Sequence, residues 1–226
     1  MVYTADESLA PSAGQGIGRY VPRRISVRVD PLLRIQGYDD PSSVRSVIRN
    51  TAESVVDVAQ RAFRPEVFHR RMRIASCIDD GLMLETGTTF RSGAFSAFLN
   101  ECDQVVVFIV TVGADVDSVL RNFSEKGQVL EALLMETAGW LGVEATTKSF
   151  TQHLRAQAKK EGHRITRRLG PGYSYQVGTN TFEWPLNQQT SLFALFDSVP
   201  LSVRLLDSCA MIPKMSRSGL YGLRPQ

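Results

Sequence analysis

The middle of the chain carries its strongest hydrophobic pattern. The segment DQVVVFIVTVG, residues 103–113, is apolar and β-branched almost throughout, which is typical of a strand buried on both faces. Shorter strand-like runs contain alternating or β-branched apolar residues and are bounded by turn residues. We expect these strands at residues 24–29, 71–77, 81–87, 203–213 and 218–223, with Asp79-Asp80-Gly81 as the hairpin turn between the second and the third.

Helical periodicity accounts for most of the other apolar residues. Residues 44–62 place Val, Ile and Ala along one face, Ser42 or Ser43 is positioned to cap this helix, and Pro65 ends it. The longest helix should cover residues 128–160, a length of roughly 45–50 Å at 1.5 Å per residue. Shorter helices are predicted at residues 92–102, 114–127 and 185–196.

An acidic residue falls on the apolar face of the long helix. With 100° per residue, Glu144 lies inside the arc defined by apolar neighbours. A lone buried carboxylate is costly, so Glu144 needs a cationic partner. Two interpretations remain open, namely a buried salt bridge and a contact to a ligand. The arc contains Leu130, Leu133, Leu134, Thr137, Ala138, Leu141 and Ala145.

The stretch RRLGPGYSYQ is the richest in candidate binding chemistry, within a long segment that we expect to be an ordered loop. Gly170 and Gly172 allow positive φ angles and a close backbone approach, and Pro171 restricts the residue before it. Arg168 could hold a carboxylate with two hydrogen bonds, and Tyr173 offers an aromatic face to a cation or a base. The set suits a zwitterionic ligand with a base, and a plain tight turn is the alternative interpretation.

Composition and charge narrow the class of protein. Hydrophobic residues make up 43% of the sequence, enough for a sizeable core, and the net charge of +3 is too small to indicate nucleic-acid binding. The three cysteines form no CxxC pair, and the three histidines have no metal-ligand spacing, which argues against a disulfide framework or a metal site. The longest apolar run has six residues, 105–110, and is too short to span a membrane. We therefore expect a cytoplasmic protein without nucleic-acid or membrane partners.

The beginning of the chain differs from the rest. Residues 1–22 are rich in Ser, Ala and Gly and lack the apolar core of a signal peptide, so we expect a flexible N-terminal tail. AGQGIG, residues 13–18, resembles a dinucleotide-binding loop but has neither a strand before it nor a helix after it. Residues 23–226 then form a single domain, because no linker or internal repeat interrupts them.

The order of these segments resembles the activation domain of cobalamin-dependent methionine synthase, in a standalone form. Arg168 followed by LGPGY matches the family's Arg-x-x-Pro-Gly-Tyr, Glu144 matches an acid on the family's long helix, and SGLY at 218–221 matches a Ser-Gly-x-Tyr. Gln36-Gly37-Tyr38 stands where the family carries Ile-Asp-Trp. The resemblance covers most of the chain from about Ile25, and its specific part is the C-terminal third.

The resemblance implies an α+β fold, a mainly antiparallel twisted sheet with surrounding helices and one long central helix. It also implies a subunit that binds S-adenosylmethionine and supports reductive remethylation of cob(II)alamin on a partner cobalamin-binding methyltransferase protein, with a flavodoxin-like or other reductase as electron donor. Such a subunit is one component of a split methionine synthase and carries no catalytic residue of its own. Two alternatives remain: an activator of another corrinoid methyltransferase, and a non-catalytic binding or scaffold relative. By matched position, the ligand contacts would be Arg168 for the carboxylate, Gly170, Pro171, Gly172 and Tyr173 for the adenosyl group, Glu144 for the cationic end, and Tyr221 closing the pocket near the cobalamin.

Overall fold

An antiparallel sheet of seven strands forms the centre of the protein, which is described by a computed structural model over residues 16–78 and 80–226. The strand order is β4-β3-β2-β5-β11-β6. Strands β1 and β3 pair with the same edge of β2, β1 with its first half and β3 with its second half. All strand pairs of this sheet that the structure describes are antiparallel. The strands are β1 (Ile17–Tyr20), β2 (Glu66–Ile78), β3 (Gly81–Leu84), β4 (Thr89–Arg91), β5 (Gln104–Thr111), β6 (His163–Ile165) and β11 (Ser216–Pro225).

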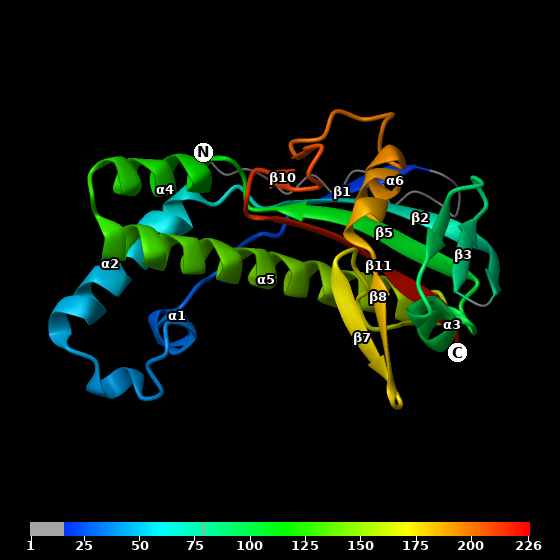
Figure 1. Ribbon diagram of the computed structural model, residues 1–226, viewed down its shortest axis with the longest axis horizontal. Helices are drawn as coiled ribbons and strands as arrows, with labels where there is room; N and C mark the ends of the chain where they lie inside the picture. Colours follow the sequence, from blue (N-terminus) through cyan, green and yellow to red (C-terminus); the bar gives the residue numbers. More distant parts are fainter. Residues whose placement is uncertain (1–15, 79) are drawn as a thin grey trace.

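Helices cover one face of the sheet, and a mixed layer covers the other. Figure 1 shows the long helix α5 running along the sheet, with α1, α2 and α4 grouped at one end and α3, α6 and the hairpin β7–β8 at the other. The helices are α1 (Val29–Ile35), α2 (Ser46–Ala62), α3 (Ala94–Leu99), α4 (Asp115–Glu125), α5 (Val129–Lys160) and α6 (Gln189–Ala194), with short 3-10 turns η1 (Pro41–Ser43) and η2 (Leu186–Gln188). Two small hairpins complete the fold, β7 (Tyr173–Val177) with β8 (Asn180–Trp184) and β9 (Arg204–Leu205) with β10 (Met211–Ile212).

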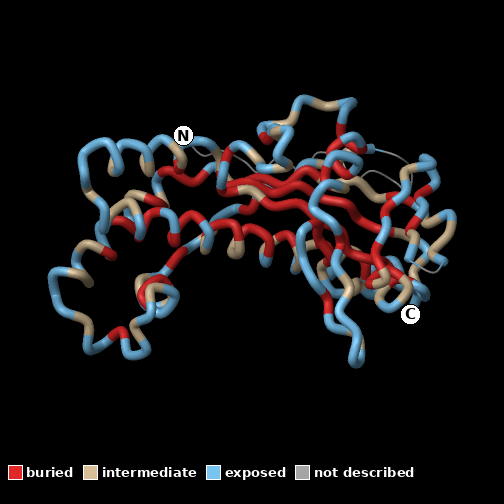
Figure 2. Tube along the Cα trace, viewed as in Figure 1, coloured by how far each residue is buried: buried red, intermediate tan, exposed pale blue. Residues whose placement is uncertain are grey.

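Strand β5 divides the interior into two cores. Phe108 and Val110 point to the core beneath α1, α2, α4 and α5, whereas Val107 and Ile109 point to the core beneath α3, α6 and the hairpin β7–β8. Figure 2 shows the buried trace concentrated in the central strands and the adjoining part of α5. The predicted α+β class, antiparallel sheet, doubly buried strand and single long helix are therefore confirmed.

The segment before α1 differs from the prediction. Residues 24–29 form no strand, and α1, which was not predicted, begins at Val29. Val27 is buried and Ile25 packs against the same core. The alternation of the segment thus reflects side chains that enter the core from an extended connection without a strand partner.

The start of α2 also differs from the prediction. Ser42 and Ser43 belong to η1, where the Asp40 side chain accepts hydrogen bonds from the N–H and hydroxyl of Ser42. Helix α2 begins three residues later, and its N-cap residue Arg45 makes no side-chain capping bond. The serines therefore serve a separate turn instead of the helix.

Two segments expected to lack regular structure form strands. The stretch after the Gly-Pro-Gly turn folds into the hairpin β7–β8, with Gly178 at φ +59° in its turn. Strand β1, Ile17–Tyr20, lies inside the expected tail of residues 1–22 and pairs with β2. The first fifteen residues of that tail, and Asp79 of the predicted turn, lie outside the described residues. At both places glycine-rich composition is compatible with strand pairing, so composition alone does not predict a loop.

The buried face of α5 is rotated from the predicted arc. Gly139 and Gly142 face the core, where an added Cβ would press against Met215 and Phe63 respectively. Leu130 and Leu133 lie exposed instead. Close approach of the helix at its glycines therefore decides which face is buried, and Glu144 lies at the edge of that face. Within the part of the chain that the structure describes, no helix has both the length and the apolar character needed to cross a membrane.

Candidate functional site

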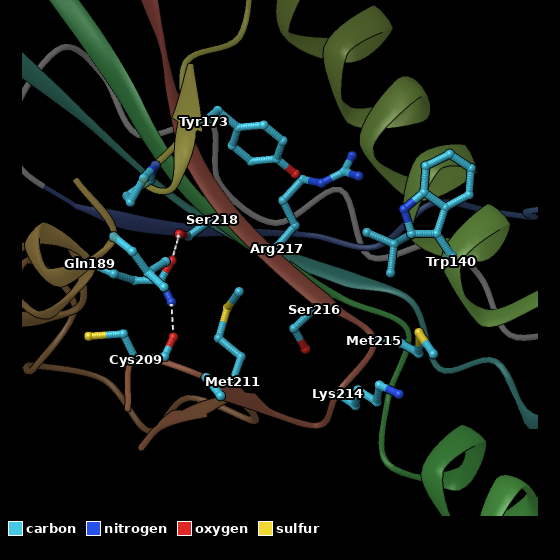
Figure 3. A pocket seen from close by; sticks show the side chains of 14 residues that line it. Trp140, Tyr173, Gln189, Cys209, Met211, Lys214, Met215, Ser216, Arg217 and Ser218 are labelled. Atoms are coloured by element: carbon cyan, nitrogen blue, oxygen red, sulfur yellow. Dashed lines mark hydrogen bonds between the residues drawn. The ribbon is translucent and has the colours of Figure 1, made fainter. Parts of the chain in front are cut away.

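A pocket opens where α5, the Gly-Pro-Gly turn and the chain around β10 and β11 meet. Figure 3 shows its walls, and its cavity volume is about 250 Å³. Trp140 and Val143 come from α5, Pro171 and Tyr173 from the turn, and Arg217 from β11. Two predicted ligand contacts, Pro171 and Tyr173, therefore lie in one pocket wall.

Arg217 and Glu144 form an ion pair beside this pocket. Arg217 Nη2 lies 2.6 Å from Glu144 Oε1, and the side chains are 7% and 38% exposed respectively. Nη1 of Arg217 is buried and has no hydrogen-bond partner among the described residues. Glu144 thus has the cationic partner that its position on α5 demanded, and that partner faces a cavity.

The Gly-Pro-Gly turn is held by its own hydrogen bonds. The Tyr175 hydroxyl accepts the Gly170 N–H at 2.6 Å and donates to the Gly170 carbonyl at 3.1 Å. The Gly172 N–H donates to the Trp184 carbonyl at 2.6 Å, and Gly172 has φ +79°, which favours glycine. Because both glycine N–H groups are already bonded, the turn presents Pro171 and Tyr173 to the pocket instead of bare N–H groups.

Arg168 lies next to Tyr173 but does not line the pocket. Its Cζ atom is 5.8 Å from the centre of the Tyr173 ring, within cation–π range. The preceding Arg167 lies over different rings, those of Phe98 and Tyr175. The charge of Arg168 therefore lies against the ring of Tyr173. The same charge also acts to lower the pKa of Tyr221.

Tyr221 is a core residue in this structure. Its ring is 3% exposed, stacks on Phe108 with 5.3 Å between ring centres, and its hydroxyl lies 2.6 Å from Thr151 Oγ1. Burial raises the pKa of Tyr221, although the Thr151 hydrogen bond and the charges of Arg168 and Arg217 oppose the increase. The structure does not bring Tyr221 to the pocket wall, although the charges of Arg168, Arg217 and Glu144 act on the pKa of its hydroxyl.

The rest of the SGLY motif builds one side of the pocket. Ser218 Oγ donates to Gln189 Oε1 at 3.0 Å, and Gln189 Nε2 donates to the Cys209 carbonyl at 2.8 Å, as the dashed lines in Figure 3 show. This buried chain of bonds ties α6 and the β9–β10 arm to β11. The motif therefore fixes the wall that faces Arg217.

Sequence reasoning missed four residues of this site, namely Arg217, Trp140, Tyr175 and Gln189. Arg217 had a usable signal, because it lies four positions before Tyr221 and so on the same face of a strand. Trp140 likewise lies four residues before Glu144 on α5, where neighbours share a face. Tyr175 and Gln189 had no such signal, since their bonds depend on contacts between distant segments. The structure shows no group of three or more His, Cys, Asp or Glu suited to a metal ion within residues 16–78 and 80–226.

Comparison with known proteins gives one informative result. No family model matches the chain, and neither does any curated protein. The fold does match a solved structure, the crystal structure of the MetH reactivation domain bound to AdoHcy. The TM-score is 0.64, and the match covers 93% of this chain and 79% of that one. The protein shares its fold with the MetH reactivation domain. Sequence identity is 15%, so the similarity to the MetH reactivation domain shows a common architecture and leaves ligand and partner to be argued from the site.

Proposed function

We propose that this protein binds S-adenosylmethionine and S-adenosylhomocysteine in the pocket beside Arg217. The observation that carries the proposal is a cavity lined by a buried guanidinium and aromatic rings, with a carboxylate ion-paired to that guanidinium, in a fold that it shares with a domain crystallised with AdoHcy. These groups complement the carboxylate, the ammonium and the base of such a ligand respectively. The predicted contacts of Glu144, Gly170, Pro171, Gly172, Tyr173 and Tyr221 belong to this proposal. Arg168, which the resemblance assigns to the carboxylate, lies against the Tyr173 ring and supports the aromatic side of the pocket.

The size of the cavity fits a ligand that is held but not enclosed. Its volume of about 250 Å³ is at the lower end for small-molecule sites. Trp140, Tyr173 and Leu186 line it while remaining largely exposed, at 47%, 43% and 44%. A bound ligand would therefore keep part of its surface open to a partner protein, which is what transfer of a group between two proteins requires.

We propose further that the protein is a reactivation component of a cobalamin-dependent methyltransferase system in the cytoplasm, with a flavodoxin-like or other reductase as electron donor. S-adenosylmethionine supplies a methyl group for a cobalamin carried by the partner. The residues of this chain then hold the amino-acid end of the ligand, orient the base against Tyr173 and exclude water from the buried side. This work is positioning, so no general base is needed.

Calorimetric titration with S-adenosylhomocysteine tests the binding step. Tyr173→Ala should weaken binding about 10-fold, because stacking a base on an aromatic ring contributes about 1–3 kcal/mol. Tyr173→Phe keeps the ring and should bind within about 2-fold of the wild type, which makes it the matched control. Absence of binding heat in the wild-type protein would refute the proposal.

A second experiment tests the reactivation step. The protein is mixed with a cobalamin-binding methyltransferase protein, a reductant and methyl-labelled S-adenosylmethionine, and methylcobalamin is followed by its absorbance. Formation that depends on this protein and falls in Arg168→Ala supports the proposal. Recovery of a different corrinoid methyltransferase in a pull-down would favour the related activator function.

A non-catalytic scaffold is the second candidate, and one position favours it. In the resemblance, Gly37 stands where the family carries the Asp of Ile-Asp-Trp. Glycine has no side chain, so this position offers no negative charge to a cationic ligand. Binding of the cobalamin protein without any binding of the adenosyl ligand would support this candidate.

A further inference from the structure

One buried polar group without a hydrogen-bond partner belongs to a residue of the pocket wall. Four buried side-chain polar atoms among the described residues lack a hydrogen-bond partner, and they belong to Arg70, Asp117, Trp184 and Arg217. Of these residues, only Arg217 lines the pocket. A buried N–H group of a charged residue is costly to leave unbonded, so Nη1 of Arg217 marks a place where an acceptor belongs.

We propose that Arg217, and not Arg168, binds the α-carboxylate of the ligand, and that Glu144 binds the adjacent α-ammonium. The proposal rests on the proposed adenosyl-ligand function and assigns its amino-acid end to specific side chains. Arg217 has one nitrogen, Nη2, committed to Glu144 and the other, Nη1, free. Glu144 is not part of the pocket wall itself, but it is bonded to Arg217, which is, and its side chain is 38% exposed, so a ligand bound to Arg217 can reach it.

The spacing of charges supports this assignment. In an α-amino acid, the carboxylate and the ammonium are attached to the same carbon atom, so their receptors must also be neighbours. The Arg217–Glu144 pair, 2.6 Å between Nη2 and Oε1, places a cation and an anion side by side. The head group can then dock antiparallel to the pair, with each charge against its opposite.

The other cations near the pocket are less suited to the carboxylate. Lys214 lines the pocket, but its Nζ atom lies 2.6 Å from Glu136 Oε1, and both side chains are about half exposed. Arg168 faces the ring of Tyr173 and is absent from the pocket wall. Figure 3 shows the guanidinium of Arg217 between Tyr173 and Trp140 in that view. Burial makes Arg217 the stronger receptor, because a charge-assisted hydrogen bond is less screened there.

The test compares S-adenosylhomocysteine with its decarboxylated analogue by calorimetry. The wild-type protein should prefer the intact ligand by about 10- to 100-fold, the range expected for hydrogen bonds to a charged group. Arg217→Met should reduce this preference to less than about 3-fold while retaining binding of the analogue, and that retained binding also reports that the variant folds. Glu144→Gln should weaken both ligands by a similar factor, because both keep the ammonium.

Two arginine variants complete the design. Arg168→Met should lower both affinities together and leave the preference intact, whereas Arg121→Met, which removes an exposed charge on α4, should change neither. If Arg217→Met does not fold, the Arg168→Met variant provides the test. Loss of its preference for the intact ligand over the decarboxylated analogue would overturn the proposal. A wild-type protein that binds both ligands equally would overturn it too, while leaving the proposed function standing. A wild-type protein that binds neither would refute both.

Discussion

At the scale of single residues, the SGLY motif has three different structural roles. Ser218 donates a hydrogen bond to Gln189 and fixes the pocket wall. Gly219 leaves no room for a Cβ because the Leu169 carbonyl oxygen is close to it. Tyr221 packs in the core against Phe108. Leu169, just before the Gly-Pro-Gly turn, and Leu220 on β11 exchange two backbone hydrogen bonds. The motif thus holds the Gly-Pro-Gly turn on β11, so that a short local sequence positions a site built from distant segments.

Gly219→Ala tests the close contact between Leu169 and β11. An added Cβ would overlap the Leu169 carbonyl oxygen, and backbone cannot move aside as a flexible side chain can. We expect a loss of about 2–3 kcal/mol in the free energy of unfolding, measured by urea denaturation. Gly81→Ala, where the nearest atom to a new Cβ is 3.5 Å away, should cost less than about 1 kcal/mol. Equal losses in the two variants would contradict this role of Gly219.

At the scale of secondary-structure elements, prediction from sequence succeeded where one local pattern decides the outcome. Strand β5 and helix α5 were predicted because a run of β-branched residues and a long helical periodicity each specify one element. The hairpin β7–β8 was missed because its glycines and aromatics are also typical of loops, and its inward residue Tyr175 is buried only by contact with distant segments. Prediction of the site had the same limit: the Arg168–Tyr173 segment was evident in the sequence, whereas Arg217 gained significance only from its pairing with Glu144 across two elements.

The junction of β1, β2 and α5 should make stability depend on pH. His69 on β2 is covered by Gly18 of β1 and by Phe150 of α5, whose ring centre is 5.2 Å away. Burial, helped by the nearby His153, lowers the pKa of His69 from 6.5 to about 4. The unfolded chain therefore binds more protons than the folded one between these values, so the free energy of unfolding should fall as the pH decreases from about 6.5 to about 4.

Thermal or urea unfolding at several pH values checks this expectation. One pKa unit corresponds to about 1.4 kcal/mol, so the loss due to His69 is on the order of 3 kcal/mol. His69→Phe keeps a ring against Phe150 and should flatten the profile, leaving a smaller slope from His153, whose pKa is also lowered by burial. A His69→Phe profile as steep as the wild type would show that His69 is not the responsible group.

At the scale of the whole molecule, one sheet carries both cores. Strand β5 sends alternate side chains to opposite sides, so the core beneath α5 and the core around Trp184 share the same backbone. If β5 leaves the sheet, the apolar residues of both cores are exposed to water. We therefore expect residues 23–226 to unfold as a single cooperative domain.

The two tryptophans allow this cooperativity to be measured. Trp184 is fully buried and packs edge-on against Phe90 and Phe95, whereas Trp140 is about half exposed on α5. In the Trp140→Phe variant, fluorescence reports only the core around Trp184, while helical circular dichroism is dominated by α5 and its neighbours on the opposite face. The two signals should give coincident urea transitions, with midpoints equal within experimental error. Separate midpoints would mean that the faces of the sheet unfold independently, and the pocket, which draws its walls from both α5 and α6, would then be lost when the less stable face unfolds.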